Sequence, residues 1–173
     1  QGAGHNPELN LAGVAQAHLL TETLRPLGMR IIYSSPLQRA LQTAEIIGRE
    51  LHIPVIVNND LIEGNFGING QYHKDIILTE EYKNWRNLDA EYIHFRFEGG
   101  ESKYEIMQRM FAAVSALLKT SEEVIGISSH SAAIRCLMLQ FGLKMKRLEN
   151  GALLRLTYND GTWSVEEICD DSE

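Results

Sequence analysis

Apolar side chains recur along the chain in patterns typical of helices that alternate with strands. Helical spacing is found in four segments, residues 11–28, 36–51, 102–120 and 131–142. Short runs rich in β-branched residues, typical of buried strands, lie between them at 29–35, 53–57 and 123–129. This order predicts an α/β domain in three layers, with a mostly parallel mixed sheet flanked by helices.

Cap and turn signals mark the ends of several of these elements. Asn10 is a suitable cap for the first helix. One face of that helix carries Leu11, Val14, His18 and Leu19. Ser102 and Glu105 have the spacing of a capping box at the start of the third helix. Residues 153–168 alternate around Asn-Asp-Gly, which predicts a β-hairpin.

Residues 58–100 differ from the rest of the chain because they are rich in glycine and aromatic residues and lack a sustained period. A short helix is expected near residues 79–88. A length of 173 residues suits one domain. We therefore expect a single domain over residues 1–173, in which residues 58–100 form a lid-like insertion.

Composition mainly excludes classes of partner. Sixteen Lys and Arg against 23 Asp and Glu give a net charge of −7, which provides no general attraction to nucleic acid or anionic lipid. No stretch approaches the ~18–20 consecutive apolar residues of a membrane span. The two cysteines, Cys136 and Cys169, lack CxxC spacing and favour reduced thiols in a cytoplasmic protein. The oligomeric state is not predicted.

The common cofactor and metal motifs are absent from the sequence. It contains no GxxxxGK[ST] loop, no GxGxxG segment that opens a helix, and no GxSxG elbow. Its six histidines are too far apart for an HxxxH pair. The sequence therefore predicts neither a metal nor a cofactor.

Two strand-to-helix junctions carry the candidate chemistry. Residues 33–35 lead into a helix that carries Arg39 in its first turns, and residues 127–129 lead through His130 into a helix that begins at Ser131 or Ala132. Ligands of open parallel sheets bind outside the carboxyl ends of the strands. Helix N-termini bind phosphate, and arginine can bind it with two parallel hydrogen bonds. The junctions predict an anion pocket, most simply for phosphate.

The first junction also carries a family resemblance. YSSPLQRALQTAEII resembles the S-S-x-L-x-R-A-x-Q-T-A segment of the histidine phosphatase superfamily, the phosphoglycerate-mutase-like proteins. The other segments that are similar to this family follow its order, and they are QGAGHNPELNLAGVAQA, DLIEGNFGINGQ, FEGGES, ISSHSAAIR and NGALLRLTYNDGTW. Six ordered segments cover essentially the whole chain, which makes the resemblance more specific than any single motif.

The resemblance implies a metal-independent phosphomonoester hydrolase that acts on a small phosphorylated substrate. In this family a histidine of an N-terminal Arg-His-Gly motif takes up the phosphoryl group, and water or a second substrate then accepts it. By the resemblance, Arg39 holds the phosphate oxygens, and His130 donates a hydrogen bond to the transferred group. Ser131 is expected to bind substrate beside them, and Glu63 is expected to donate a proton to the leaving oxygen.

The chain departs from the family pattern at two places. The Arg-His-Gly motif is not among the 173 residues, and we expect it just before Gln1, at the end of a short strand. Ser131 follows His130 where the family often has glycine, and serine at a helix start is a competent cap. His5 is not expected to be the nucleophile, because no strand precedes it.

Two other functions remain open at this stage. One is a phosphoglycerate mutase, although the chain has little of the loop material that shields the intermediate in mutases. The other is a non-catalytic protein that binds phosphorylated ligands on the same fold. Residues that could line a substrate cap, but are expected to be ordinary surface, are Tyr72, His73, Lys74 and Arg96.

Overall fold

A computed structural model describes residues 2–67, 80–86, 92–144 and 148–168 of the chain. Its helices are α1 (Leu11–Leu24), α2 (Gln38–Leu51), α4 (Glu80–Arg86), α5 (Lys103–Leu117) and α6 (Ser131–Leu139). Its strands are β1 (Ile31–Ser34), β2 (Val55–Val57), β3 (Ile125–Ser128), β4 (Leu153–Asn159) and β5 (Thr162–Ile168). Short 3-10 turns, η1 (Arg25–Leu27) and η2 (Asn59–Leu61), follow α1 and β2.

The strands form two separate sheets within the described residues. The first has the order β2-β1-β3, and both of its pairs are parallel. The second is the antiparallel hairpin β4-β5, which turns at Asp160 and Gly161 with positive φ at both residues. The alternating order of strands and helices confirms the predicted α/β class, and the hairpin confirms the predicted turn.

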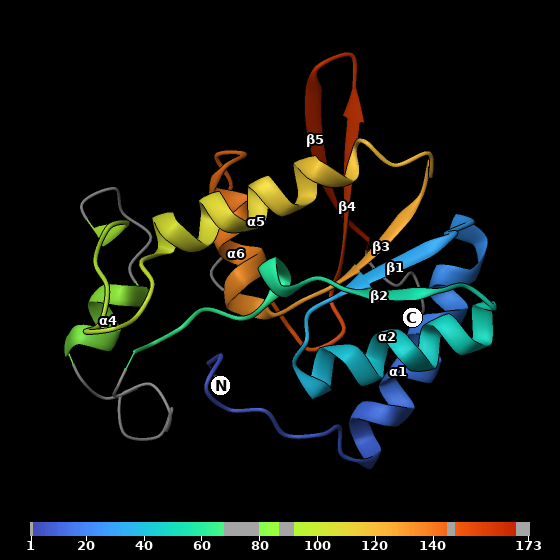
Figure 1. Ribbon diagram of the computed structural model, residues 1–173, viewed down its shortest axis with the longest axis horizontal. Coiled ribbons are helices and arrows are strands. Elements are labelled where there is room, and N and C mark those ends of the chain that lie inside the picture. The colour runs from blue at the N-terminus through green and yellow to red at the C-terminus, as the bar shows by residue number, and fades with distance from the viewer. Residues whose placement is uncertain (1, 68–79, 87–91, 145–147, 169–173) are drawn as a thin grey trace.

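Helices cover both faces of the parallel sheet. Figure 1 shows α1 and α2 on one side of it and α5 and α6 on the other. Neighbouring residues of β1 face these two layers: Ile32 packs in a cluster with Ala44 and Ile47 of α2, whereas Tyr33 packs against the larger cluster that includes Met110. This alternation places the three-layer core where the sequence predicted it.

The face of α1 that carries Leu11 and Leu19 does not pack into the core. Leu11 is 89% exposed and Leu19 is 73% exposed. The residues that this helix buries are Ala17, Thr21 and Leu24. Because α1 is apolar on nearly every side, its hydrophobic pattern does not select one face. Thr21 enters the core without an unpaired hydroxyl, since its Oγ1 donates to the carbonyl of Ala17 at 3.0 Å.

The predicted start of α5 is confirmed. Ser102 Oγ accepts a hydrogen bond from the backbone N–H of Glu105 at 3.1 Å, and the Glu105 carboxylate accepts one from the Ser102 N–H at 2.8 Å. Cys136 is buried in α6, and Cys169 lies outside the described residues. Within the described ranges, every helix is too short or too polar to cross a membrane.

Candidate active site

The two predicted junctions lie side by side at one edge of the sheet. Ser34 of β1 and Ser128 of β3 are paired residues at the carboxyl ends of adjacent strands. The next residue, Ser35, donates its N–H to the Ser128 carbonyl at 2.9 Å, so the two loops leave the sheet together. The segments that carry Arg39 and His130 therefore start from a common, buried edge.

Arg39 is the second residue of α2, and one of its guanidinium nitrogens has no hydrogen-bond partner in the part of the chain that the structure describes. Its Nη1 donates to the carbonyl of His5 at 2.6 Å. Its Nη2 is buried and contacts no acceptor among the described residues. Burial lowers the pKa of Arg39 and the charge of Glu63 raises it, but arginine stays protonated in proteins. A buried N–H of a cation without an acceptor is costly, and an anionic oxygen would satisfy it.

His130 caps α6 and is held by a serine of the other junction. Its side chain is buried, and its Nε2 lies 2.7 Å from Ser35 Oγ. Ser35 Oγ also accepts the N–H of Leu37 at 3.3 Å, which fixes the hydroxyl in place. Burial, followed by the charges of Arg39 and Arg109, lowers the pKa of His130 from 6.5 to about 3. The imidazole is therefore neutral at neutral pH.

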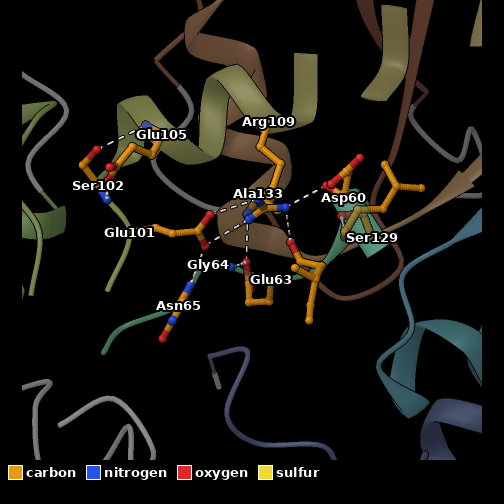
Figure 2. A network of polar contacts seen from close by, with 12 residues as sticks. Asp60, Glu63, Gly64, Asn65, Glu101, Ser102, Glu105, Arg109, Ser129 and Ala133 are labelled. Carbon is orange, nitrogen blue, oxygen red and sulfur yellow. Dashed lines mark hydrogen bonds and ion pairs between the residues drawn. The ribbon is translucent and has the colours of Figure 1, made fainter. Parts of the chain in front are cut away.

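Glu63 places its carboxylate at the N-terminus of α6. The residue is 5% exposed, and its Oε1 accepts the N–H groups of Gly64 and Ala133, both at 2.9 Å. Its Oε2 accepts the Ala132 N–H in a longer contact of 3.4 Å. Figure 2 shows the side chain of Glu63 directed at this helix end. Burial raises the pKa of Glu63, against the backbone N–H groups and the charge of Arg39, which lower it.

A pocket opens beside Glu63. Its volume is about 150 Å³, and the residues that line it are Glu63, Phe66, Tyr82, Trp85, Ser131, Ala132 and Arg135. Ser131, the first residue of α6, is exposed at this pocket and donates its hydroxyl to the Leu148 carbonyl at 3.4 Å. The pocket combines an aromatic wall with a carboxyl group and a guanidinium. It can therefore hold a polar ligand group next to the Glu63 carboxyl.

The structure thus brings together most of the residues that the sequence singled out. The charge of Arg39 acts on the pKa of both Glu63 and His130, and Glu63 accepts an N–H of the helix that His130 precedes. Arg96 instead contacts Glu105 at 3.0 Å on the surface. The other residues named with it as possible cap residues but expected to be ordinary surface, Tyr72, His73 and Lys74, lie outside the described residues.

Sequence reasoning missed three residues that support the site, namely Ser35, Glu101 and Arg109. Ser35 and Glu101 stood inside segments that resemble the family, YSSPLQRALQTAEII and FEGGES, which was the available signal. Arg109 carried no signal of its own, because nothing in the sequence relates a helical arginine to a loop 47 residues away.

The site and the fold define a class of protein that the whole sequence also matches. The profile of the histidine phosphatase superfamily (branch 1) matches residues 1–171, and the chain belongs to this superfamily, whose members are phosphatases or mutases. The family that the sequence resembled is thereby confirmed. The chain is 33% identical over 171 residues to the probable phosphoglycerate mutase GpmB of Citrobacter koseri, and the match covers 94% of this chain and 79% of that protein. The protein of the same name from Shigella boydii is 32% identical over 173 residues, with the same coverage.

Solved structures share the fold at lower sequence identity. A mycobacterial glucosyl-3-phosphoglycerate phosphatase, in complex with inorganic phosphate, superposes with a TM-score of 0.82 at 22% identity, and the match covers 96% of this chain and 89% of that one. The α-ribazole phosphatase of Shigella flexneri gives a TM-score of 0.78 at 20% identity, with 97% and 87% covered. Both comparisons confirm the predicted architecture.

Proposed function

We propose that this protein hydrolyses phosphomonoesters through a phosphohistidine intermediate. The observation that carries the proposal is the buried Arg39 Nη2, which has no acceptor among the described residues. Arg39 lies near Glu63 and near His130, whose ring is neutral. In this proposal the nucleophile is the histidine of an Arg-His-Gly motif that precedes Gln1. Arg39 and His130 then bind the phosphoryl oxygens, and Glu63 serves the leaving group.

The reaction has two steps. In the first, a ring nitrogen of the nucleophilic histidine forms a bond to phosphorus while the ester P–O bond breaks, and the leaving oxygen takes the proton of the Glu63 carboxyl. In the second, water attacks phosphorus and gives a proton to the Glu63 carboxylate, while the P–N bond breaks. The products are an alcohol and inorganic phosphate, and both histidine and Glu63 return to their starting states.

The environment of each group suits this chemistry. Phosphoryl transfer needs positioning and neutralisation of charge on the equatorial oxygens, which the guanidinium of Arg39 supplies. The neutral ring of His130 still carries one N–H, which can donate a hydrogen bond to the same oxygens. Burial raises the pKa of Glu63, so its carboxyl keeps a proton at a pH where an exposed glutamate is ionised.

We place the leaving group of the substrate in the pocket beside Glu63. The volume of about 150 Å³ suits a small phosphorylated substrate, and Arg135 favours a leaving group that carries negative charge. Glycerate, which appears in the names of a curated relative and of a structural neighbour, is such a carboxylate. The aromatic wall includes Tyr82 and Trp85 of α4, which supports a lid-like role for residues 58–100 within a single domain.

The alternative activity is that of a phosphoglycerate mutase, which the names of the curated relatives favour. A mutase returns the phosphoryl group to substrate, whereas a phosphatase passes it to water. Incubation of the full-length protein with a phosphoglycerate separates the two, because a mutase interconverts the isomers faster than it releases phosphate. Saturable binding without either reaction would instead indicate a non-catalytic ligand-binding protein.

The decisive experiment measures phosphate release by the full-length protein, including any residues that precede Gln1. Removal of Arg39 or His130 deletes a group that stabilises the transferred phosphoryl group, so Arg39→Ala and His130→Ala should each lower kcat/KM about 10²–10³-fold. Arg49→Ala, an exposed arginine in the last turn of the same helix, is the matched control and should retain activity. Intact turnover in both site variants would sink the proposal.

A rapid-quench experiment addresses the intermediate itself. With a substrate labelled in its phosphoryl group, the protein should acquire label that is released by acid and stable to alkali, as expected for a phosphoramidate. A labelled protein with the opposite stability would contradict a phosphohistidine.

A further inference from the structure

We infer that Arg109 and Glu101 form a positioning pair that fixes the Glu63 carboxyl against α6, in the place from which it protonates the leaving oxygen. This inference rests on the proposed function, and it assigns a role to two residues that do not line the pocket beside Glu63. Figure 2 shows the network that carries it.

Arg109 ties α5 to the chain just before Glu63. Its Nη1 donates to the carbonyls of Asp60 at 2.7 Å and Ile62 at 3.0 Å. Its Nε and Nη2 donate to the two carboxylate oxygens of Glu101 at 2.9 and 3.1 Å. A single guanidinium thus fills four acceptors at once, a geometry that the point charge of a lysine cannot reproduce.

Glu101 ties the same arginine to the chain just after Glu63. Its Oε2 accepts the N–H of Asn65 at 2.9 Å, and its own backbone N–H donates to the Asn65 carbonyl at 2.7 Å. The ion pair therefore makes hydrogen bonds to the backbone at Ile62 on one side of Glu63 and at Asn65 on the other. Only Glu63 and Gly64 lie between the two points of attachment.

A third tie reaches the loop from the sheet. Ser129, the residue that follows β3, donates its hydroxyl to the carbonyl of Leu61 at 2.8 Å. The loop is thus held by α5 and by the strand end that leads to His130. Because the backbone on both sides of Glu63 is fixed, its carboxyl meets the N–H groups of α6 in one arrangement.

Such a fixed position matters for the proposed chemistry. A general acid must lie within hydrogen-bond reach of the oxygen that it protonates, and misplacement of a reacting group by about 1 Å can cost about 10²-fold in rate. The Arg109–Glu101 pair is also half-buried, with side chains only 18% and 25% exposed, so solvent screens it less than a surface pair.

The test compares two substrates of the full-length protein. Glycerol phosphate releases an alkoxide that needs a proton, whereas nitrophenyl phosphate releases a stable phenolate that does not. Arg109→Lys should lower kcat on glycerol phosphate about 10- to 100-fold, with a much smaller effect on nitrophenyl phosphate and on KM. Glu101→Gln should act in the same direction, and it serves as a milder second variant if the first fails to fold.

The dependence of kcat on pH provides a second test, because a general loss of stability would not shift its alkaline limb. The alkaline limb of kcat on glycerol phosphate reports loss of the acid form. In Arg109→Lys the loosened carboxyl gains solvent, so this limb should shift toward lower pH. Arg155→Lys changes an exposed pair with Glu166 on the β4–β5 hairpin, and as a matched control it should leave both the rates and the limb unchanged.

The outcomes distinguish failure of the positioning role of Arg109 and Glu101 from failure of the acid role of Glu63. An equal loss on both substrates, or no loss, in folded Arg109→Lys and Glu101→Gln overturns the positioning role. Glu63→Gln is the reference: if it shows the selective loss on glycerol phosphate while the pair variants do not, only the positioning pair fails. If Glu63→Gln hydrolyses both substrates as the wild type does, the acid role of Glu63 fails and the pair fails with it.

Discussion

Two helices begin at the same edge of the sheet after similar serine-containing loops, yet their N-termini are filled in different ways. At α6, the N–H groups of Ala132 and Ala133 bind the carboxylate of Glu63. At α2, the N–H of Gln38 binds the neutral side chain of Asn6 at 2.6 Å, and that of Leu37 binds Ser35.

The difference shows that a strand-to-helix junction does not by itself make an anion site. A helix N-terminus attracts an anion only where its N–H groups are still free, and here side chains of the protein occupy several of them. Among the described residues, the buried side-chain nitrogen left without an acceptor is Nη2 of Arg39, in the first turn of α2. In the proposed reaction, phosphate therefore binds on the α2 side, and the Glu63 carboxyl faces the leaving group on the α6 side.

The largest effect expected from this comparison is on the binding of inorganic phosphate. Arg39→Ala removes charge-assisted hydrogen bonds worth about 1.5–3 kcal/mol, so phosphate should bind about 10- to 150-fold more weakly. Glu63→Gln should not weaken binding, because it adds no negative charge to the neighbourhood and leaves Arg39 in place. Isothermal titration of each full-length variant measures both affinities.

Arg49→Ala is the matched control for this titration, since it removes an exposed arginine from the same helix. A larger loss of phosphate affinity in Glu63→Gln than in Arg39→Ala would contradict the assignment of phosphate to the α2 junction. That result would mean that the bound phosphate depends on Glu63 more than on Arg39.

A second prediction concerns acid stability at the α6 junction. The folded-state pKa of His130 is about 3, below the usual 6.5, because the ring is buried near Arg39. The unfolded chain therefore binds a proton between these values that the folded chain excludes. The stability from neutral His130 is fully present above about pH 6.5 and is lost as the pH falls toward 3.

Thermal unfolding from pH 7 to pH 4 tests this prediction. The midpoint of the wild type should fall more steeply than that of His130→Gln, by several degrees in total, since about 1 kcal/mol corresponds to about 2–4 °C in a chain of this size. His18→Gln, which changes an exposed histidine of α1, corrects for the loss of a surface histidine. Parallel curves for wild type and His130→Gln would contradict an excluded proton at His130.

The contrast between the junctions also marks what a sequence can predict. The elements followed from local patterns, such as the capping box of Ser102 and Glu105 and the alternation around the hairpin turn. The family followed from ordered motifs, and the profile match confirms it. Arg39 and His130 could be placed at one sheet edge because parallel strands bring their carboxyl ends together.

The parts that sequence reasoning missed depend on long-range contacts or on ambiguous patterns. The bond between Glu63 and the Ala133 N–H spans 70 residues, and periodicity carries no information on such a pairing. The buried face of α1 could not be chosen from the sequence because apolar side chains of the helix point in nearly every direction. Leu11 and Leu19 lie on its exposed side. Which N-terminus is already filled is therefore a property of the folded chain alone.

The smallest predicted effect tests the neutral cap of α2. Asn6 is exposed, and its Oδ1 accepts the Gln38 N–H at 2.6 Å. Asn6→Ala should cost about 0.5–1 kcal/mol, as for other exposed caps, and lower the unfolding midpoint by about 1–4 °C. The loss is limited because a second contact, from the Leu9 N–H to Gln42 at 2.8 Å, also holds this segment to α2.

Asn6→Asp sharpens the same experiment because it keeps the acceptor and adds a negative charge. A carboxylate at a helix N-terminus is favourable by about 0.3–1 kcal/mol, so this variant should be at least as stable as the wild type. The introduced carboxylate would then accept an N–H at the start of α2, as the Glu63 carboxyl does at α6. Its charge near Arg39 should weaken phosphate binding. Unchanged phosphate affinity in a stable Asn6→Asp protein would mean that the anion does not bind at the α2 junction.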